Sequence, residues 1–290
     1  MVLSDQPPVK KRVTPVNLLI ASAIVVAIQF AALAVTGLNA PIYNTIVSST
    51  GPSYAPAGTS VTGSFLNAII LVAFAFALTL ALLWLLRRRM VTSFKVIVFA
   101  SVAFSAFILT LVTADNFAVL YLPSSFEVPV AFGGAALVVA LVAYIIFVKN
   151  SLWLSTAVLA FVGAQVGSFF AETLPTWTAL ALPIAFSIYD IYAVFRGPLK
   201  ALIGTSPGIA LVGMSVRAGE FTLGLGDIVF YTLLPCLAYF NWGIAQSIYT
   251  MVAIDVGMVV TLFLLSKRRL LPGLPIPMLL GVLVIAFYLR

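Results

Sequence analysis

Long apolar runs alternate with short polar segments along the whole chain, and this pattern sets the expected architecture. The runs fall at residues 16–38, 64–86, 94–113, 128–148, 152–171, 175–195, 222–240, 243–266 and 273–289. A helix needs about 20 apolar residues to cross the hydrocarbon core of a bilayer, where backbone polar groups must be paired within the helix. The pattern therefore predicts an all-α fold, a polytopic membrane bundle of nine transmembrane helices.

These spans are expected to form a single membrane domain over residues 1–290. Spans one to six occupy 1–195, a cytosolic loop follows at 196–221, and spans seven to nine occupy 222–290. The loop contains the apolar stretch ALIGTSPGIALVGM, but Pro207 and several glycines interrupt it, so it is not expected to cross the bilayer. The first run is longer than the apolar region of a signal peptide, so we expect a retained first helix.

Composition supports a bilayer as the solvent of the whole chain. Hydrophobic residues make up 63% and charged residues 8%, with a mean hydropathy of +1.19. The net charge of +7 comes from Lys and Arg that cluster at the ends of apolar runs, a distribution typical of membrane topology signals. We therefore expect the lipid bilayer, and no nucleic acid, as a partner.

The basic residues also predict the orientation of the chain. With nine spans and a cytosolic N-terminus, all but one of the 15 basic residues fall on the cytosolic side; only Arg290 falls outside. The external connection at 39–63 contains no Lys or Arg. Since cytosolic loops carry an excess of Lys and Arg, we predict a multi-pass protein of a prokaryotic cell membrane with an external C-terminus.

Residues that the chain lacks exclude several hydrolytic chemistries. It has no histidine, which a serine protease of the rhomboid type needs as a base and a zinc protease needs as a ligand. Its one cysteine, Cys236, excludes a cysteine-rich metal site. We therefore expect neither a metal nor a cofactor.

Eight acidic residues remain as candidate chemistry, and their positions divide them into two groups. Five are expected in connections or at span ends, where water reaches them: Asp5, Asp115, Glu127, Glu172 and Glu220. The other three, Asp190, Asp227 and Asp255, lie within spans. A charged side chain at the bilayer centre costs at least about 2.5–3.5 kcal/mol, so each of these three is a candidate functional residue.

Two of these three carboxyl groups are predicted to lie at the same depth. Asp190 precedes Arg196 by six residues, roughly 9 Å at the helical rise, and Asp227 follows Glu220 by seven, roughly 10 Å. Apart from Lys95 at the cytosolic end of the third run, no basic residue lies in any span, so two facing carboxyl groups would share one proton. A shared proton is the arrangement of an aspartic protease, although a structural pair of polar residues is the alternative.

Asp255 lies deeper, roughly 18 Å from Lys267, and is expected to hydrogen-bond a polar residue of a neighbouring helix.

Glycines and prolines surround the predicted pair. Gly224 and Gly226 leave room either for another backbone or for close helix packing. Pro272 and Pro275 fit either a substrate-contacting segment or an ordinary helix start. The stretch GAQVG, residues 163–167, has the small-x-x-x-small spacing of a helix contact.

Three short motifs in this order resemble those of the presenilin and signal peptide peptidase family of intramembrane aspartyl proteases. They are YDIYAVF from Tyr189, GLGDIVFY from Gly224 and LPGLPIP from Leu271, on the sixth, seventh and ninth predicted spans. The resemblance covers the topology of the whole chain. It implies a two-aspartate protease that cleaves transmembrane helices or remnant signal peptides, with no cofactor.

The resemblance also implies roles for individual residues. Asp190 and Asp227 would be the catalytic pair. The residues that shape the site or hold substrate would be Tyr189, Gly224, Leu225, Gly226, Pro272, Gly273, Leu274 and Pro275. Gly273 departs from the alanine of the family motif and makes this segment more flexible. The partners would be transmembrane-helix substrates; no accessory subunit is evident, and a homo-oligomer stays open.

Two rival functions fit part of the pattern. A prepilin-type membrane aspartyl peptidase shares the glycine–aspartate motif, but it usually has a lysine where this chain has Val229, and it lacks the proline motif. A proton- or cation-coupled transporter would use Asp255 near the bilayer midplane, although no clear inverted repeat is visible.

Overall fold

The computed structural model describes residues 15–50, 55–148, 151–195, 215–218, 221–267 and 271–289. These ranges hold nine α-helices and one two-stranded sheet. The helices are α1 (Pro15–Thr50), α2 (Val61–Arg87), α3 (Val91–Tyr121), α4 (Glu127–Ala143), α5 (Leu152–Thr173), α6 (Thr176–Phe195), α8 (Leu225–Trp242), α9 (Ile244–Lys267) and α10 (Pro275–Tyr288). The predicted all-α bundle of nine helices is confirmed.

Seven of these helical segments are long and apolar enough to cross a membrane, counting only the described residues. They are α1, α2, α3, α4 with its flanking turns, α5, α6 and α9. The turns that flank α4 are a 3₁₀ turn, Ser124–Phe126, and a π-helical turn, Tyr144–Val148. α8 lies in the interior of the bundle, and α10 is a shorter apolar helix of 14 residues. The chain is an integral, multi-pass membrane protein.

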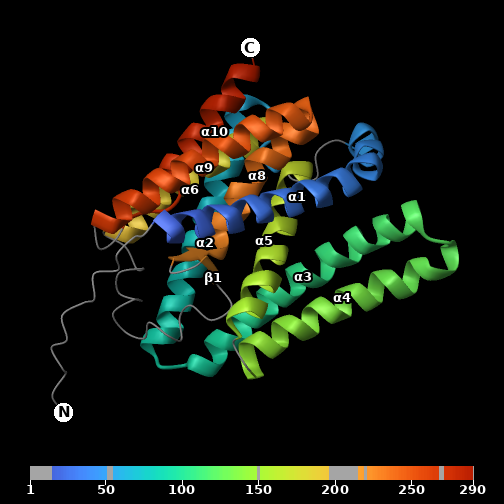
Figure 1. The fold of residues 1–290 in the computed structure, drawn as a ribbon, viewed down its shortest axis with the longest axis horizontal. Coiled ribbons are helices and arrows are strands. Elements are labelled where there is room, and N and C mark those ends of the chain that lie inside the picture. The colour runs from blue at the N-terminus through green and yellow to red at the C-terminus, as the bar shows by residue number, and fades with distance from the viewer. Residues whose placement is uncertain are drawn as a thin grey trace.

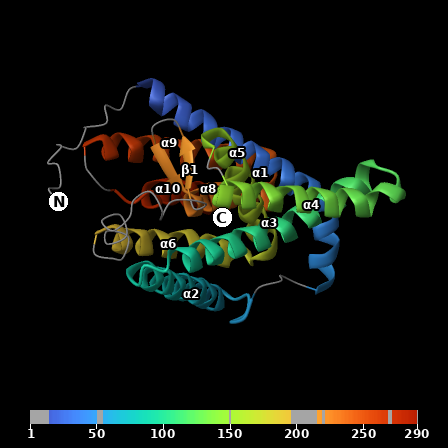
Figure 2. The same cartoon turned by 90° about the horizontal axis from the view of Figure 1, so that it is seen from below.

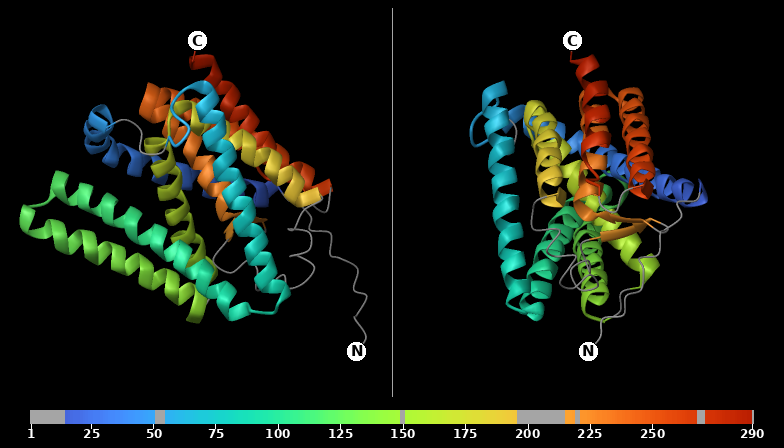
Figure 3. Two further views of the ribbon diagram at one scale, coloured as in Figure 1. Left: turned by 180° about the vertical axis from the view of Figure 1, so that it is seen from behind. Right: turned by 90° about the vertical axis from the view of Figure 1, so that its left-hand side faces the viewer.

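The central element is α8, which packs against α5, α9, α1, α10 and α6. Every residue from Phe230 to Ala238 is buried, so this helix has no lipid-facing stripe in its middle. In Figure 1, α8 lies behind α1 and between α5 and α9, whereas α3 and α4 form a hairpin that projects away from this group. Figure 3 shows the same projection from behind.

Small residues let α5 and α8 approach closely. A Cβ atom on Gly163 would lie 2.8 Å from Cγ2 of Ile228, and one on Gly167 would lie 2.7 Å from the carbonyl oxygen of Val229. Neither position has room for a larger residue without movement of α8. The predicted helix contact at residues 163–167 is therefore confirmed.

The outer helices carry the apolar surface that faces lipid. α2 packs mainly against α6, beside which it runs in Figure 2, and most of its length is exposed. Large exposed side chains such as Phe74, Phe104 and Phe132 lie on α2, α3 and α4. In water such a surface would be costly, but in a bilayer it replaces lipid–lipid contacts without penalty.

The sheet corrects two predicted boundaries. Strands β1 (Ser215–Ala218) and β2 (Phe221–Gly224) pair antiparallel, so part of the predicted loop at 196–221 is a hairpin, and residues 222–224 are strand rather than the start of span seven. Val216, Phe221 and Leu223 are buried while Thr222 is exposed, an alternation that suits a strand. Residues 196–214 and 219–220 of that loop lie outside the described residues.

The first helix is also longer than predicted. α1 continues through Pro41 to Thr50, so the first part of the predicted external connection at 39–63 is helical. The other helices begin and end within a few residues of the predicted runs, except that α3 continues to Tyr121.

Candidate active site

Asp227 lies in the first turn of α8, directly after strand β2. Its Oδ2 atom accepts the backbone N–H of Gly224 at 3.0 Å, a bond that caps the start of the helix. The expected position, two turns inside a membrane helix, is therefore wrong, because the residues between Glu220 and Asp227 are mostly extended. Asp227 therefore lies close to the junction between strand β2 and helix α8.

Asp190 lies in the last part of α6 and reaches the segment that precedes α10. The backbone N–H of Leu274 donates to Oδ2 of Asp190 at 3.1 Å. Leu274 is only 5% exposed, so this contact is made in the interior of the protein. A backbone donor holds the Asp190 carboxyl group in place from the far end of the sequence.

Gly273 brings the same segment against the other carboxyl group. A Cβ atom on Gly273 would lie 3.2 Å from Oδ2 and 3.3 Å from Oδ1 of Asp227. The carbonyl oxygen of Gly273 accepts a hydrogen bond from the Tyr231 hydroxyl at 3.0 Å. Tyr231 stands one turn after Asp227 on α8, so one helix face presents both side chains to Gly273.

The two carboxyl groups therefore converge on one short piece of backbone, residues 273–274. They also interact electrostatically with each other. Among the described residues, no Lys or Arg acts on either group, so no cation compensates a second negative charge there. Two carboxyl groups in this setting can hold one proton between them, which would provide one acid and one base at the same place.

The remaining predicted site residues fall into three positions. Gly226 is exposed, and no described atom lies within 4 Å of the place where its Cβ would stand, which favours room for another backbone over helix packing. Leu225 is half-buried and faces Gly163 of α5. Pro272 is buried, and Pro275 begins α10 beside the site.

Tyr189 points toward a different neighbour. Its hydroxyl donates to Oγ1 of Thr79 on α2 at 3.1 Å, and its ring stacks edge-on against Phe76 and Phe186. The contact holds α6 against α2, one residue away from Asp190. Tyr189 thus supports the site from outside and contacts neither carboxyl group in the described set of hydrogen bonds.

Asp255 has the kind of neighbour that the sequence led us to expect. The Gln29 side chain of α1 hydrogen-bonds its carboxyl group across the bundle. Gln29 also donates to the backbone carbonyl oxygen of Tyr231 at 3.3 Å. The third carboxyl group within a span is therefore linked to α8 through an amide of α1.

Glu172 was expected to be solvated, and this prediction is wrong. The side chain is 6% exposed, and its Oε1 accepts the Ser168 hydroxyl at 2.9 Å. Ser168 in turn bonds Thr36 of α1 at 2.7 Å, and Asn39 hydrogen-bonds the Glu172 carboxyl group. Although Glu172 is the penultimate residue of α5, α1 covers that end of the helix. Asp115 is exposed and Glu127 half-buried, while Asp5 and Glu220 lie outside the described residues.

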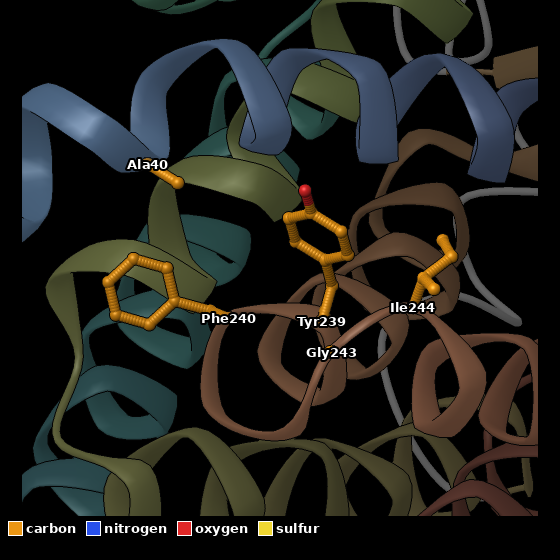
Figure 4. A pocket seen from close by; sticks show the side chains of 5 residues that line it. All are labelled: Ala40, Tyr239, Phe240, Gly243 and Ile244. Atoms are coloured by element: carbon orange, nitrogen blue, oxygen red, sulfur yellow. The ribbon is translucent and has the colours of Figure 1, made fainter.

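An open pocket lies elsewhere, where α1 passes the junction of α8 and α9. It has a volume of about 440 Å³ and is lined by Ala40, Tyr239, Phe240, Gly243 and Ile244 (Figure 4). None of these residues is acidic, and Tyr239 stands twelve residues after Asp227 on α8, roughly 18 Å along the helix. The pocket is separate from the two aspartates. In the part of the chain that the structure describes, no group of three or more potential metal-ligating His, Cys, Asp or Glu residues gathers.

Fold and site together define a polytopic helical membrane protein with two aspartates facing one backbone segment. A family model named presenilin matches residues 8–208 and 214–289, which is nearly the whole chain. The chain belongs to the presenilin family.

Relatives and solved structures agree with this assignment. Presenilin-B of Dictyostelium discoideum is 36% identical over 120 residues, a match that covers 38% of this chain and 25% of that protein. Two crystal forms, C222 and P2, of a presenilin family intramembrane aspartate protease have TM-scores of 0.62 and 0.61 at 22% and 21% identity. They cover 94% and 93% of this chain, and 99% and 97% of their own. At this identity they establish the shared fold.

Proposed function

We propose that this chain is an intramembrane aspartyl endopeptidase with Asp190 and Asp227 as its catalytic pair. The observation that carries the proposal is the convergence of both carboxyl groups on residues 273–274. Family membership and the solved structures named as intramembrane aspartate proteases support it.

The shared proton accounts for both halves of peptide hydrolysis. The ionised carboxylate removes a proton from a water molecule, whose oxygen attacks the carbonyl carbon, while the protonated carboxyl group donates to the carbonyl oxygen. When the tetrahedral intermediate collapses, the C–N bond breaks and the amine leaves with a proton from the group that took it from water, while a hydroxyl of the intermediate returns its proton to the other aspartate as the carbonyl forms again. The products are a carboxylic acid and an amine, and the pair again holds one proton.

A substrate helix must expose an amide before this chemistry can begin, because its backbone groups are paired with each other. Gly226 is exposed, and strand β2 runs directly toward Asp227, so an unwound substrate segment has a place to lie beside the dyad. In the described sheet β2 pairs only with β1, which leaves its other edge for strand addition. The backbone at Pro272–Pro275 offers a second candidate surface.

The proposed partners are transmembrane helices of membrane proteins, or remnant signal peptides. The distribution of Lys and Arg supports a cytosolic N-terminus and an external C-terminus in a prokaryotic cell membrane. In that orientation the dyad, at the end of α6 and the start of α8, lies toward the cytosolic side. We propose a water-filled cavity that opens there.

Purified protein in liposomes tests this function with a model transmembrane peptide. We expect cleavage within the apolar segment and inhibition by a peptide that carries a hydroxyl transition-state isostere. Cleavage restricted to a prepilin leader at the membrane border would support the prepilin-type peptidase instead. Proton or sodium flux without any cleavage would support a transporter and contradict the proposal.

A further inference from the structure

Two polar residues outside the dyad, Gln29 of α1 and Asp255 of α9, meet at the helix that carries Asp227. Gln29 is fully buried and donates to the Tyr231 carbonyl oxygen, and its amide also hydrogen-bonds Asp255. Asp255 interacts electrostatically with Tyr231 as well. Three helices, α1, α8 and α9, are joined at this point by polar side chains in an otherwise apolar interior.

Tyr231 connects this junction to the active site. Its backbone is held by Gln29, and its hydroxyl donates to Gly273, which lies against the Asp227 carboxyl group. The next residue, Leu274, donates its N–H to Asp190. A displacement of Tyr231 would therefore move the one backbone segment that both aspartates contact.

Two acceptor atoms at this junction, both unpaired among the described residues, indicate the protonation state of Asp255. Gln29 Oε1 and Asp255 Oδ1 are both buried, and neither has a hydrogen-bond partner among the described residues. Gln29 must direct its NH₂ group to the Tyr231 carbonyl oxygen, so its own oxygen needs a donor. A proton on Asp255 supplies that donor, and no cation among the described residues faces Asp255 to favour a carboxylate.

We infer that Gln29 and a neutral Asp255 are positioning residues that hold Tyr231, and through it residues 273–274, against the catalytic pair. The role rests on the proposed protease function for its effect on catalysis, but the hold on residues 273–274 is a property of the structure alone. Asp255→Asn keeps a neutral donor at this place, whereas Asp255→Leu and Gln29→Leu remove it.

Hydrogen–deuterium exchange of the full-length protein in nanodiscs tests the inference without reference to activity. We expect the amide exchange rate over residues 271–276 to rise about tenfold in Asp255→Leu, Gln29→Leu and Tyr231→Phe. Each variant loses about one of the hydrogen bonds that connect Asp255 to Gly273. Asp255→Asn should exchange like the unmodified protein. Thr261→Val is the matched control, because Thr261 is a buried polar residue of α9 whose hydroxyl donates within its own helix, to Gly257.

Cleavage kinetics then test the consequence for catalysis. In Asp255→Leu and Gln29→Leu we expect kcat to fall about tenfold with KM little changed, with Asp255→Asn restoring kcat. Unchanged exchange at 271–276 in Gln29→Leu and Asp255→Leu would overturn the inference, and so would an Asp255→Asn protein that behaves like Asp255→Leu. Tyr231→Phe decides the question if the leucine variants do not fold. A protein with the expected exchange pattern but no cleavage would contradict the proposed function and would not contradict this inference.

Discussion

Carboxyl groups lie at several places along α8, and the surroundings of two of these places differ in kind. At the start of the helix, Asp227 and Asp190 receive backbone N–H donors from Gly224 and Leu274 and interact electrostatically with each other. Farther along, near Cys236, Glu172 stands as a single carboxyl group among side-chain donors. In the first arrangement two carboxyl groups can share one proton. In the second, a single carboxyl group accepts hydrogen bonds from neutral side chains.

The hydrogen-bond partners explain why we propose catalysis at the first place and not at Glu172. Asn116 donates to the oxygen of the Asn39 amide at 3.0 Å, which leaves the NH₂ group of Asn39 for Glu172. Ser168 fills a second position on Glu172, and the residue is closed to solvent. Asp227 instead follows the exposed Gly226, and we propose that water and a peptide reach the pair from that side. Burial of a carboxyl group alone therefore does not mark a catalytic site; the proposed site differs from Glu172 in its second acid and its exposed neighbour.

The largest expected effect separates the two places directly. Asp190→Asn and Asp227→Asn should each lower the cleavage rate of a transmembrane peptide at least about a hundredfold, because each removes the acid or the base. Glu172→Gln, which keeps the shape and a neutral side chain, should cleave within about twofold of the unmodified protein. Initial rates of purified proteins in liposomes measure this. A Glu172→Gln protein as inactive as the aspartate variants would contradict the claim that cleavage depends on the aspartates and not on Glu172.

The pH profile should also belong to the aspartates alone. The rate is expected to fall at low pH, where both aspartates are protonated and no base remains, and at high pH, where both are ionised and no acid remains. Each limb should approach a tenfold change per pH unit. The profile of Glu172→Gln should superimpose on this bell shape. A rate independent of pH across the range in which the protein stays folded would argue against a shared proton.

Gly273 offers a smaller and graded effect. Its Cβ position lies 3.2–3.3 Å from the Asp227 carboxyl group, so Gly273→Ala requires a shift of a few tenths of an ångström, whereas Gly273→Val requires a larger one. We expect a loss of about twofold for alanine and about tenfold or more for valine, mainly in kcat. Gly133→Ala on α4 is the control, because no described atom lies within 4 Å of its Cβ position and it is not part of the proposed site. Equal cleavage rates for Gly273→Val and the unmodified protein would contradict the proposed role of Gly273 at the site.

The smallest effect on activity is expected at Ser168. Ser168→Ala removes a donor to Glu172 and a bond to Thr36, which should cost about 1 kcal/mol of stability. The thermal unfolding temperature should fall by a few degrees while kcat and KM stay unchanged. A change in kcat without a change in unfolding temperature would show that the Glu172 cluster takes part in catalysis.

The sequence predicted the helices well because a helix that crosses a bilayer needs a continuous run of apolar residues. It also predicted that Asp190 and Asp227 lie at one site, and both carboxyl groups do lie against residues 273–274, while their catalytic role stays a prediction. Strand β2 was missed because its buried residues, Phe221 and Leu223, continue into the apolar run of span seven. The alternation of Val216, Phe221 and Leu223 was the available signal.

Contacts between distant segments lay beyond prediction. Glu172 stands at the end of an apolar run, and only the packing of α1 over α5 buries it. The approach of residues 273–274 to both aspartates depends on how the start of α10 is seated, which no local pattern encodes. Tyr231 stands one helical turn from Asp227, so its position could have suggested a role, but its partner Gly273 could not be foreseen.

Binding of a transition-state isostere tests the central claim most directly, because it reports the pair itself rather than the whole reaction. A labelled transmembrane peptide with a hydroxyl group in place of the scissile amide should bind the unmodified protein and Glu172→Gln with equal affinity. Asp190→Asn and Asp227→Asn should each bind it at least about tenfold more weakly, since each loses part of the shared-proton site. Undiminished binding to both aspartate variants would contradict the assignment of Asp190 and Asp227 as the catalytic pair.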